Sequence, residues 1–184
     1  MTKRPDERKW FTMKALVVYE SMFGNTEQIA RAVAAGLAES IEVQLAEVSQ
    51  APAEPDPQVA LIVAGGPTHA FSMSRTNTRA DAMKRGAPEG EREFGLREWM
   101  AALPSGQHPA RIATFDTKIE SMRFAPGSAA KGAAKVARRH GYDSAVKAES
   151  FYVREVDGPL VVGEIDRARA WARQLAASMT GPDT

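Results

Sequence analysis

The chain has no cysteine and no long apolar run. Without cysteine it can have no disulfide framework, no thiolate metal site and no cysteine nucleophile. No apolar stretch approaches the ~20 residues that cross a bilayer, and residues 1–9 are charged and lack the apolar core of a signal peptide. We therefore expect a cytoplasmic protein without a membrane partner.

The chain also has little net charge. Its 24 basic and 23 acidic residues leave a formal charge of +1, which gives no reason to propose nucleic-acid binding. The 184 residues, 43% of them apolar, suit one domain with a sizeable core. Periodic patterning begins at Met13, so we predict a flexible extension over residues 1–12 and one domain over residues 13–184. No repeat and no second domain are visible.

Short apolar runs alternate with helical patterns along this domain. Strands are predicted over residues 14–19, 41–45, 59–64, 111–115 and 146–153. Helices are predicted from residue 25 or 26 to 38 and over residues 94–103, 128–140 and 164–179, with a further short one over residues 78–84. Such alternation predicts an α/β fold, a doubly wound parallel sheet with helices on both faces.

Details of the pattern refine this fold. Residues 41–45 alternate apolar and polar side chains, which places that strand at an edge of the sheet. Three prolines in residues 51–57 predict a loop instead of a crossover helix. The strand over residues 59–64 is expected to end abruptly at Gly65-Gly66-Pro67.

The turn after the first strand has the composition of a phosphate site. Residues 21–26 offer two hydroxyls, one amide and free backbone N–H groups at a helix start, where Asn25 or Thr26 can cap the helix. The chain has no G-x-x-x-x-G-K-[ST] and no G-x-G-x-x-G motif, so a single phosphate ester is favoured over a nucleotide triphosphate or a pyrophosphate. An ordinary turn with Thr26 as a simple cap is the alternative.

Two motifs carry a resemblance to a known family. Ser21-Met22-Phe23-Gly24-Asn25-Thr26 resembles the [ST]-x-[TYF]-G-N-T phosphate loop of flavodoxins. Ala64-Gly-Gly-Pro-Thr-His69 resembles the G-x-P-T-[YH] that follows their third strand. The resemblance implies five parallel strands in the order 2-1-3-4-5 and one bound FMN.

The same resemblance implies a set of cofactor-binding residues. The phosphate loop would comprise Ser21, Met22, Phe23, Gly24, Asn25 and Thr26. One face of the flavin ring would be covered by Pro67, Thr68, His69, Ala70 and Phe71. The pyrimidine edge would be lined by Phe115, Asp116, Thr117 and Lys118. Three alternatives stay open: core packing for Phe71, an exposed loop position for His69, and a cap or turn role for Asp116.

This chain departs from the family in several ways. Flavodoxins are usually acidic, whereas this chain is nearly neutral. The third loop lacks the usual Gly-Asp pair and stacking tyrosine, and Ala70 stands where the family often has glycine. Arg75 and Arg79, in the polar stretch after His69, are either solvated charges or ligands for an anionic substrate.

The leading functional hypothesis is an FMN-binding electron carrier that serves a redox partner protein or a small-molecule electron acceptor. The alternatives are an FMN-dependent NAD(P)H:quinone-type oxidoreductase and a binding module of the same fold without flavin. We predict no metal site and assign no catalytic residue. A hydrolase triad finds no support, because His69, His108 and His140 lie on unrelated segments and no G-x-S-x-G elbow exists. A phospho-receiver needs an acidic pair after its first strand and an aspartate at the end of its third, and it is rejected because those positions read Glu20-Ser21 and Gly65-Gly66.

Overall fold

The computed structural model describes residues 13–88 and 93–180, so the extension predicted over residues 1–12 lies outside the described residues. Seven strands form within that part of the chain: β1 (Lys14–Tyr19), β2 (Glu42–Glu47), β3 (Val59–His69), β4 (Ser72–Met73), β5 (Arg111–Ile119), β6 (Glu149–Glu155) and β7 (Gly158–Leu160). The helices there are α1 (Asn25–Ala38), α2 (Thr76–Lys84), α3 (Leu96–Ala102), α4 (Ala129–Arg139) and α5 (Glu164–Thr180), with 3-10 turns η1 (Val48–Gln50) and η2 (Glu120–Met122).

The five long strands lie in the order β2-β1-β3-β5-β6, and each neighbouring pair is parallel. The expected five-stranded sheet in the order 2-1-3-4-5 is therefore confirmed, with β2 at one edge. Two short antiparallel strands are additional. β7 pairs with β6 at the other edge, and β4 pairs with the end of β3.

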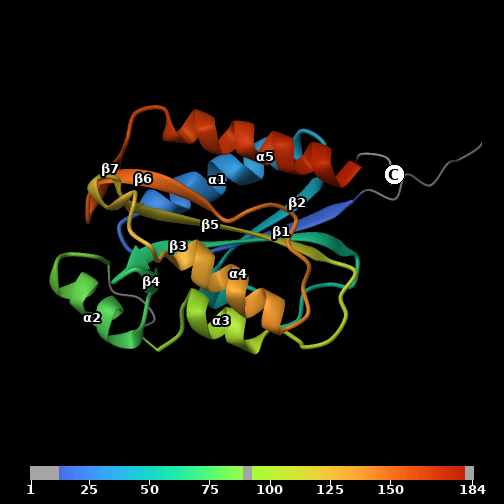
Figure 1. Ribbon diagram of the computed structural model, residues 1–184, viewed down its shortest axis with the longest axis horizontal. Coiled ribbons are helices and arrows are strands. Elements are labelled where there is room, and N and C mark those ends of the chain that lie inside the picture. Colours follow the sequence, from blue (N-terminus) through green and yellow to red (C-terminus); the bar gives the residue numbers. More distant parts are fainter. Residues whose placement is uncertain (1–12, 89–92, 181–184) are drawn as a thin grey trace, which may run out of the picture.

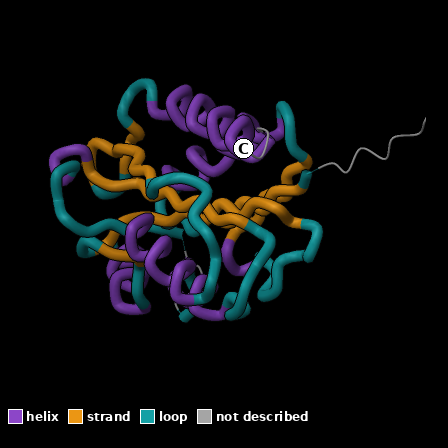
Figure 2. The backbone as a smooth tube through the Cα atoms, turned by 45° about the vertical axis from the view of Figure 1, so that its right-hand side comes forward, coloured by secondary structure: helices purple, strands orange, loops and turns teal. Residues whose placement is uncertain are grey.

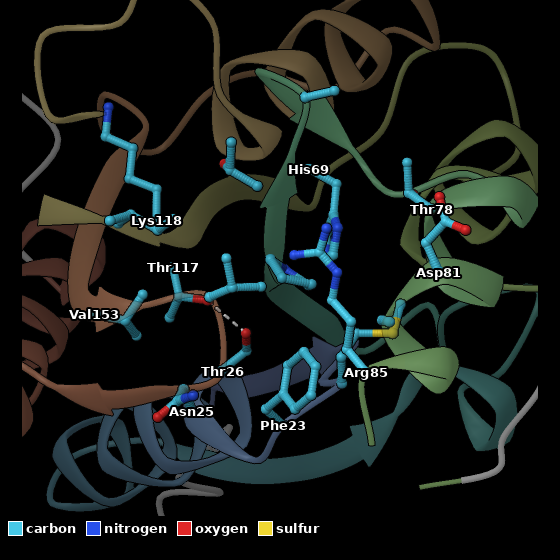
Figure 3. Close-up of a pocket in the computed structure, with 17 residues that line it drawn as sticks. Phe23, Asn25, Thr26, His69, Thr78, Asp81, Arg85, Thr117, Lys118 and Val153 are labelled. Atoms are coloured by element: carbon cyan, nitrogen blue, oxygen red, sulfur yellow. Dashed lines mark hydrogen bonds between the residues drawn. The ribbon is translucent and has the colours of Figure 1, made fainter. Parts of the chain in front are cut away.

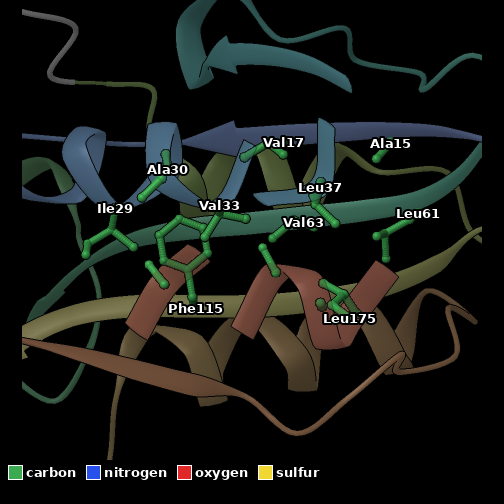
Figure 4. Close-up of a cluster of buried hydrophobic side chains, with 14 of the residues drawn as sticks. Ala15, Val17, Ile29, Ala30, Val33, Leu37, Leu61, Val63, Phe115 and Leu175 are labelled. Atoms are coloured by element: carbon green, nitrogen blue, oxygen red, sulfur yellow. The ribbon is translucent and has the colours of Figure 1, made fainter. Parts of the chain in front are cut away.

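Helices cover both faces of the sheet (Figures 1 and 2). Strand residues alternate between two cores, because successive side chains of a strand point to opposite faces. Val17, Leu61 and Val63 pack with α1 and α5 on one face (Figure 4), whereas Leu16, Val18 and Ile62 pack with α3 and α4 on the other. Each such side chain contributes roughly 1.5–3 kcal/mol by leaving water.

Two strands run further than the apolar pattern indicates. β3 does not end at Gly65 but continues to His69, and β5 continues from Phe115 to Ile119. The glycines are explained by packing. A Cβ on Gly65 would lie 2.1 Å from the Phe115 ring, and one on Gly66 would lie 2.8 Å from Leu96. The apolar pattern marks only the part of each strand that lies in the core.

Helix boundaries differ from prediction by a few residues. α1 begins after Gly24, which occupies the N-cap position in place of Asn25 or Thr26. Ser128 caps α4 as predicted, its hydroxyl accepting from the Lys131 N–H. As expected, no α-helix links β2 to β3; the connection contains only η1. Among the described residues no helix combines the length and the apolarity needed to cross a bilayer.

Candidate functional site

A cleft of about 290 Å³ opens at the carboxyl edge of the parallel strands (Figure 3). This edge is where open α/β sheets bind ligands. Of the predicted site residues, those that line the cleft are Met22, Phe23, Asn25, Thr26, Pro67, Thr68, His69, Ala70, Thr117 and Lys118. Lining residues that the sequence analysis missed come from α2 (Thr78, Asp81, Ala82 and Arg85, the last capping the helix), β5 (Ile119) and the β6–β7 hairpin (Val153 and Val156).

The loop between β1 and α1 presents a row of free backbone donors. Gly24 adopts φ 81°, and no side chain caps the helix it precedes. The Ser21 Oγ accepts from the Glu27 N–H at 3.2 Å. The backbone N–H groups of residues 22–26 donate to no acceptor in the described part of the chain. The loop therefore ends in unsatisfied amides at the positive end of the α1 dipole, a ready-made anion site.

The side chains of Asn25 and Thr26 are tied to neighbouring elements. The Asn25 Nδ2 donates to the Asp157 carbonyl at 2.9 Å, in the turn between β6 and β7. The Thr26 Oγ1 lies 2.7 Å from the Thr117 Oγ1 of β5, and either hydroxyl can donate. These two bonds hold the loop against the far wall of the cleft. The main donors that this loop leaves for a ligand are the backbone N–H groups of residues 22–26, which have no acceptor in the described part of the chain.

The turn between β3 and β4 forms the opposite rim. Ala70 and Phe71 both have positive φ, at 46° and 62°. Phe71 is 51% exposed, which excludes core packing. His69 is partly buried at the cleft, so it is not a freely exposed loop histidine. Burial, together with the positive charges of Arg79 and Arg85, lowers the His69 pKa and so favours the neutral form of the ring.

Two of the predicted residues on β5 face away from the cleft. Phe115 is fully buried, with edge contacts to Phe151 at 6.1 Å and Trp171 at 6.3 Å between ring centres. The Asp116 Oδ2 accepts from the Ala130 N–H at 2.8 Å, so this carboxylate caps α4, as its alternative interpretation proposed. Successive side chains of a strand point to opposite faces of the sheet, so Phe115 packs in one core and Asp116 contacts α4 on the other face.

A buried polar network fixes α2 as one wall of the cleft. Arg79 is 1% exposed, so it is not a solvated charge. Its Nη1 donates to the Ser74 Oγ at 2.8 Å and lies 3.9 Å from Glu20, and its Nη2 lies 3.0 Å from Glu98. The Glu20 carboxylate also accepts from Ser74 at 2.5 Å and from the Leu96 N–H at 2.8 Å. Burial nonetheless raises the Glu20 pKa, against the effect of these bonds and of Arg79.

An exposed aromatic side chain lies on the third loop of this edge. Phe124, between β5 and α4, is 91% exposed, beside Arg123, whose guanidinium also covers the Tyr152 ring at 5.0 Å. The sequence analysis assigned no stacking aromatic to this loop. It missed Phe124 because it ended the strand four residues early, at Phe115 instead of Ile119.

The sequence and the fold were compared with those of known proteins. No family model and no curated protein matches the sequence. Solved structures do match, among them a flavodoxin from the domain Archaea, with TM-score 0.61 and 18% identity over 92% of this chain and 100% of that one. Flavodoxin 2 from Bacillus cereus matches with TM-score 0.62 and 19% identity, over 89% of this chain and 97% of that one. A WrbA-like flavodoxin from Agrobacterium tumefaciens matches with TM-score 0.56 and 18% identity, over 91% of this chain and 98% of that one. The chain has a flavodoxin-like fold.

Proposed function

We propose that this protein binds one FMN noncovalently in the cleft and serves as an electron-transfer protein. The observation that carries the proposal is the row of backbone N–H groups over residues 22–26 that lack an acceptor, at the N-terminus of α1. A phosphate ester supplies the negative charge and the acceptor oxygens that these groups need. The absence of a lysine from the loop suits one phosphate.

The remaining walls fit a flat ring system. Pro67, Thr68 and Ala70, at the end of β3, and Thr117 and Lys118, in the last part of β5, all line the cleft. Ordinary ligand sites combine apolar walls with a few directed polar groups, and their volumes start near ~300 Å³. Bound FMN would supply a ring that takes up and releases electrons, while the chain binds and orients it. The proposal includes a cytoplasmic location and an external redox partner or small-molecule acceptor.

Titration of the flavin-free protein with FMN, riboflavin and FAD, followed by flavin fluorescence, tests this function. Hydrogen bonds to a charged group are worth about 1.5–3 kcal/mol, so FMN should bind roughly ten- to a hundredfold more tightly than riboflavin. FAD should not exceed riboflavin, because the loop has no pyrophosphate motif. Equal affinities for FMN and riboflavin, or no binding of either, would contradict the proposal; the latter result supports a binding module without flavin.

A matched pair of glycine variants isolates the loop. Gly24 and Gly86 have φ of +81° and +96°, and an added Cβ would meet no atom within 4 Å at either position. Alanine is strained at both by about 1–2 kcal/mol. Gly24→Ala should weaken FMN binding more than riboflavin binding, because it moves the donors of the loop. Gly86→Ala should cost similar stability and leave both affinities unchanged.

The same site also supports a second candidate function, an FMN-dependent NAD(P)H:quinone-type oxidoreductase. It is favoured by the α2 wall, which adds the exposed guanidinium of Arg85 to the cleft. A carrier that exchanges electrons only with proteins has no need of such a group. Steady oxidation of NADPH by the purified FMN-loaded protein alone would support the oxidoreductase, and its absence would leave the carrier.

A further inference from the structure

Arg85 occupies a fixed place on the wall of the cleft. It follows the last residue of α2, where its backbone N–H bonds the Ala82 carbonyl at 3.0 Å and the Asp81 carbonyl at 3.2 Å. The helix itself is anchored by buried Arg79, which pairs with Glu98 at 3.0 Å. Figure 3 shows the Arg85 guanidinium beside the His69 ring, on the side of the cleft that carries Phe23.

The guanidinium of Arg85 has no partner within the described residues. It forms no ion pair and no hydrogen bond there, and the nearby carboxylate of Asp81 pairs with Lys84 at 3.1 Å. Burial lowers the His69 pKa most, and the charged groups that act on the ring, Arg79 and Arg85, are both cationic and lower it further. Since Arg79 is already paired with acids, the uncompensated positive charge on this wall belongs to Arg85.

Three exposed apolar side chains lie on loops at the same edge of the sheet, and one of them, Val156, lines the cleft. Phe71, Phe124 and Val156 are 51%, 91% and 43% exposed, and they come from the three loops that end β3, β5 and β6. Figure 1 shows the ends of these strands together at one end of the molecule. Exposed apolar side chains near a guanidinium that has no acidic partner among the described residues suit a flat apolar body that carries one anionic group.

We propose that Arg85 binds the anionic group of a second ligand, a small flat aromatic anion that carries a sulfonate, carboxylate or phosphate. The aromatic body lies against the rim formed by Phe71, Phe124 and Val156. The use of this ligand as an electron donor or acceptor rests on the proposed function. Its binding through Arg85 does not.

The test uses two probes of nearly identical shape, naphthalene-2-sulfonate and its neutral sulfonamide, titrated into the FMN-loaded protein by calorimetry. A charge-assisted hydrogen bond should make the sulfonate bind roughly ten- to a hundredfold more tightly than the sulfonamide. Arg85→Gln should abolish this preference and leave the sulfonamide affinity unchanged. Arg75→Gln, an exposed arginine before the same helix and not among the residues that line the cleft, should keep it.

Other outcomes would overturn the proposal. Equal binding of the two probes by the wild-type protein, or a preference that survives Arg85→Gln, would show that Arg85 is not the anion ligand. A loss of FMN affinity in Arg85→Gln without a loss of riboflavin affinity would assign the guanidinium to the phosphate of the cofactor.

Failure of the proposed function is distinguishable from failure of this inference. If the protein takes up no FMN, the same titrations on the flavin-free protein still test Arg85. In that form, NMR should show the sulfonate shifting the His69 ring signals and raising the His69 pKa, because the anion offsets the charge of Arg85. Shifts confined to the amides of residues 22–26 would place the anion at the α1 loop and contradict the inference.

Discussion

Asn25 illustrates how a side chain at a ligand loop can serve the scaffold. Its Nδ2 donates to the Asp157 carbonyl of the β6–β7 turn, and the residue is 7% exposed. Gly158 permits this contact, because a Cβ there would lie 2.7 Å from the Asn25 Oδ1. The sequence resemblance implies a bond from Asn25 to phosphate, whereas in the structure the Asn25 amide donates one of its two N–H groups to Asp157.

We therefore expect Asn25→Ala to act on stability and not on phosphate selectivity. Loss of the bond to Asp157 should cost about 1 kcal/mol in urea unfolding. The affinities for FMN and riboflavin should fall by similar factors, because the backbone donors of the loop remain. Asn77→Ala, at an exposed position in α2 that does not line the cleft, is the control. A loss of FMN binding tenfold greater than that of riboflavin would instead assign the Asn25 amide to the phosphate.

A second expectation concerns the turn between β3 and β4. Ala70 has a left-handed backbone, at φ 46°, which an alanine adopts at a cost of roughly 1–2 kcal/mol. Ala70→Gly removes this strain and should raise the free energy of unfolding by about 1 kcal/mol, despite the greater entropy of glycine in the unfolded chain. Ala101→Gly, exposed in α3, should lower it by about 1 kcal/mol. Destabilisation by both variants would contradict the left-handed conformation of Ala70.

At the scale of elements, α2 is held by charges and not by an apolar stripe. Its buried residues are Arg79 and Ala82, so little apolar area fixes it to the sheet. Arg79→Met leaves Glu20 buried without its cation, which should cost about 3–5 kcal/mol and speed amide exchange in α2. Arg75→Met is the control and should change stability by less than about 0.5 kcal/mol.

The pH dependence of Arg79→Met follows from Glu20. Burial raises the Glu20 pKa above its ordinary 4.5, so the ionised carboxylate costs stability once pH rises through the folded-state pKa. Arg79 opposes that shift, and its removal enlarges the cost. The stability deficit of Arg79→Met should therefore be larger at pH 7 than at pH 4, measured by urea unfolding. A deficit independent of pH would mean that lost packing dominates.

Element prediction from the sequence succeeds where apolar periodicity is long. β1 and α5 begin where the pattern places them, and α4 is capped by the predicted Ser128. β4 and β7 were missed because they have two and three residues, too few to show a period. The ends of β3 and β5 were interpreted as loops because they lack the apolar residues that mark a core strand, although their backbones are paired within the sheet. The Arg79 network has no signature along the chain, since Glu20, Ser74 and Glu98 meet only in the fold.

At the scale of the molecule, the fold is retained without the charge that usually accompanies it. The structures it resembles share 14–19% of its residues, and the net charge is +1. An acidic surface steers basic partners over distances near the Debye length of ~10 Å. A net charge of +1 supplies no comparable overall field, so any steering of a partner by this chain would come from the local distribution of its charges.

Ligand binding in the cleft should raise the stability of the whole domain. The walls of the cleft come from α2, from the α1 loop and from the ends of β3, β5 and β6, so a bound ligand would contact elements that are far apart in the sequence. A ligand that binds only the folded state adds RT ln(1 + [L]/Kd), or about 2.7 kcal/mol at a hundred times Kd. For a domain of this size, FMN at that concentration should raise Tm by roughly 5–11 °C in calorimetry. Riboflavin at the same concentration should raise it by a few degrees at most, because it cannot satisfy the N–H groups of residues 22–26. Equal shifts for the two ligands would locate the stabilisation in the ring site alone, and the α1 loop would then have no part in binding.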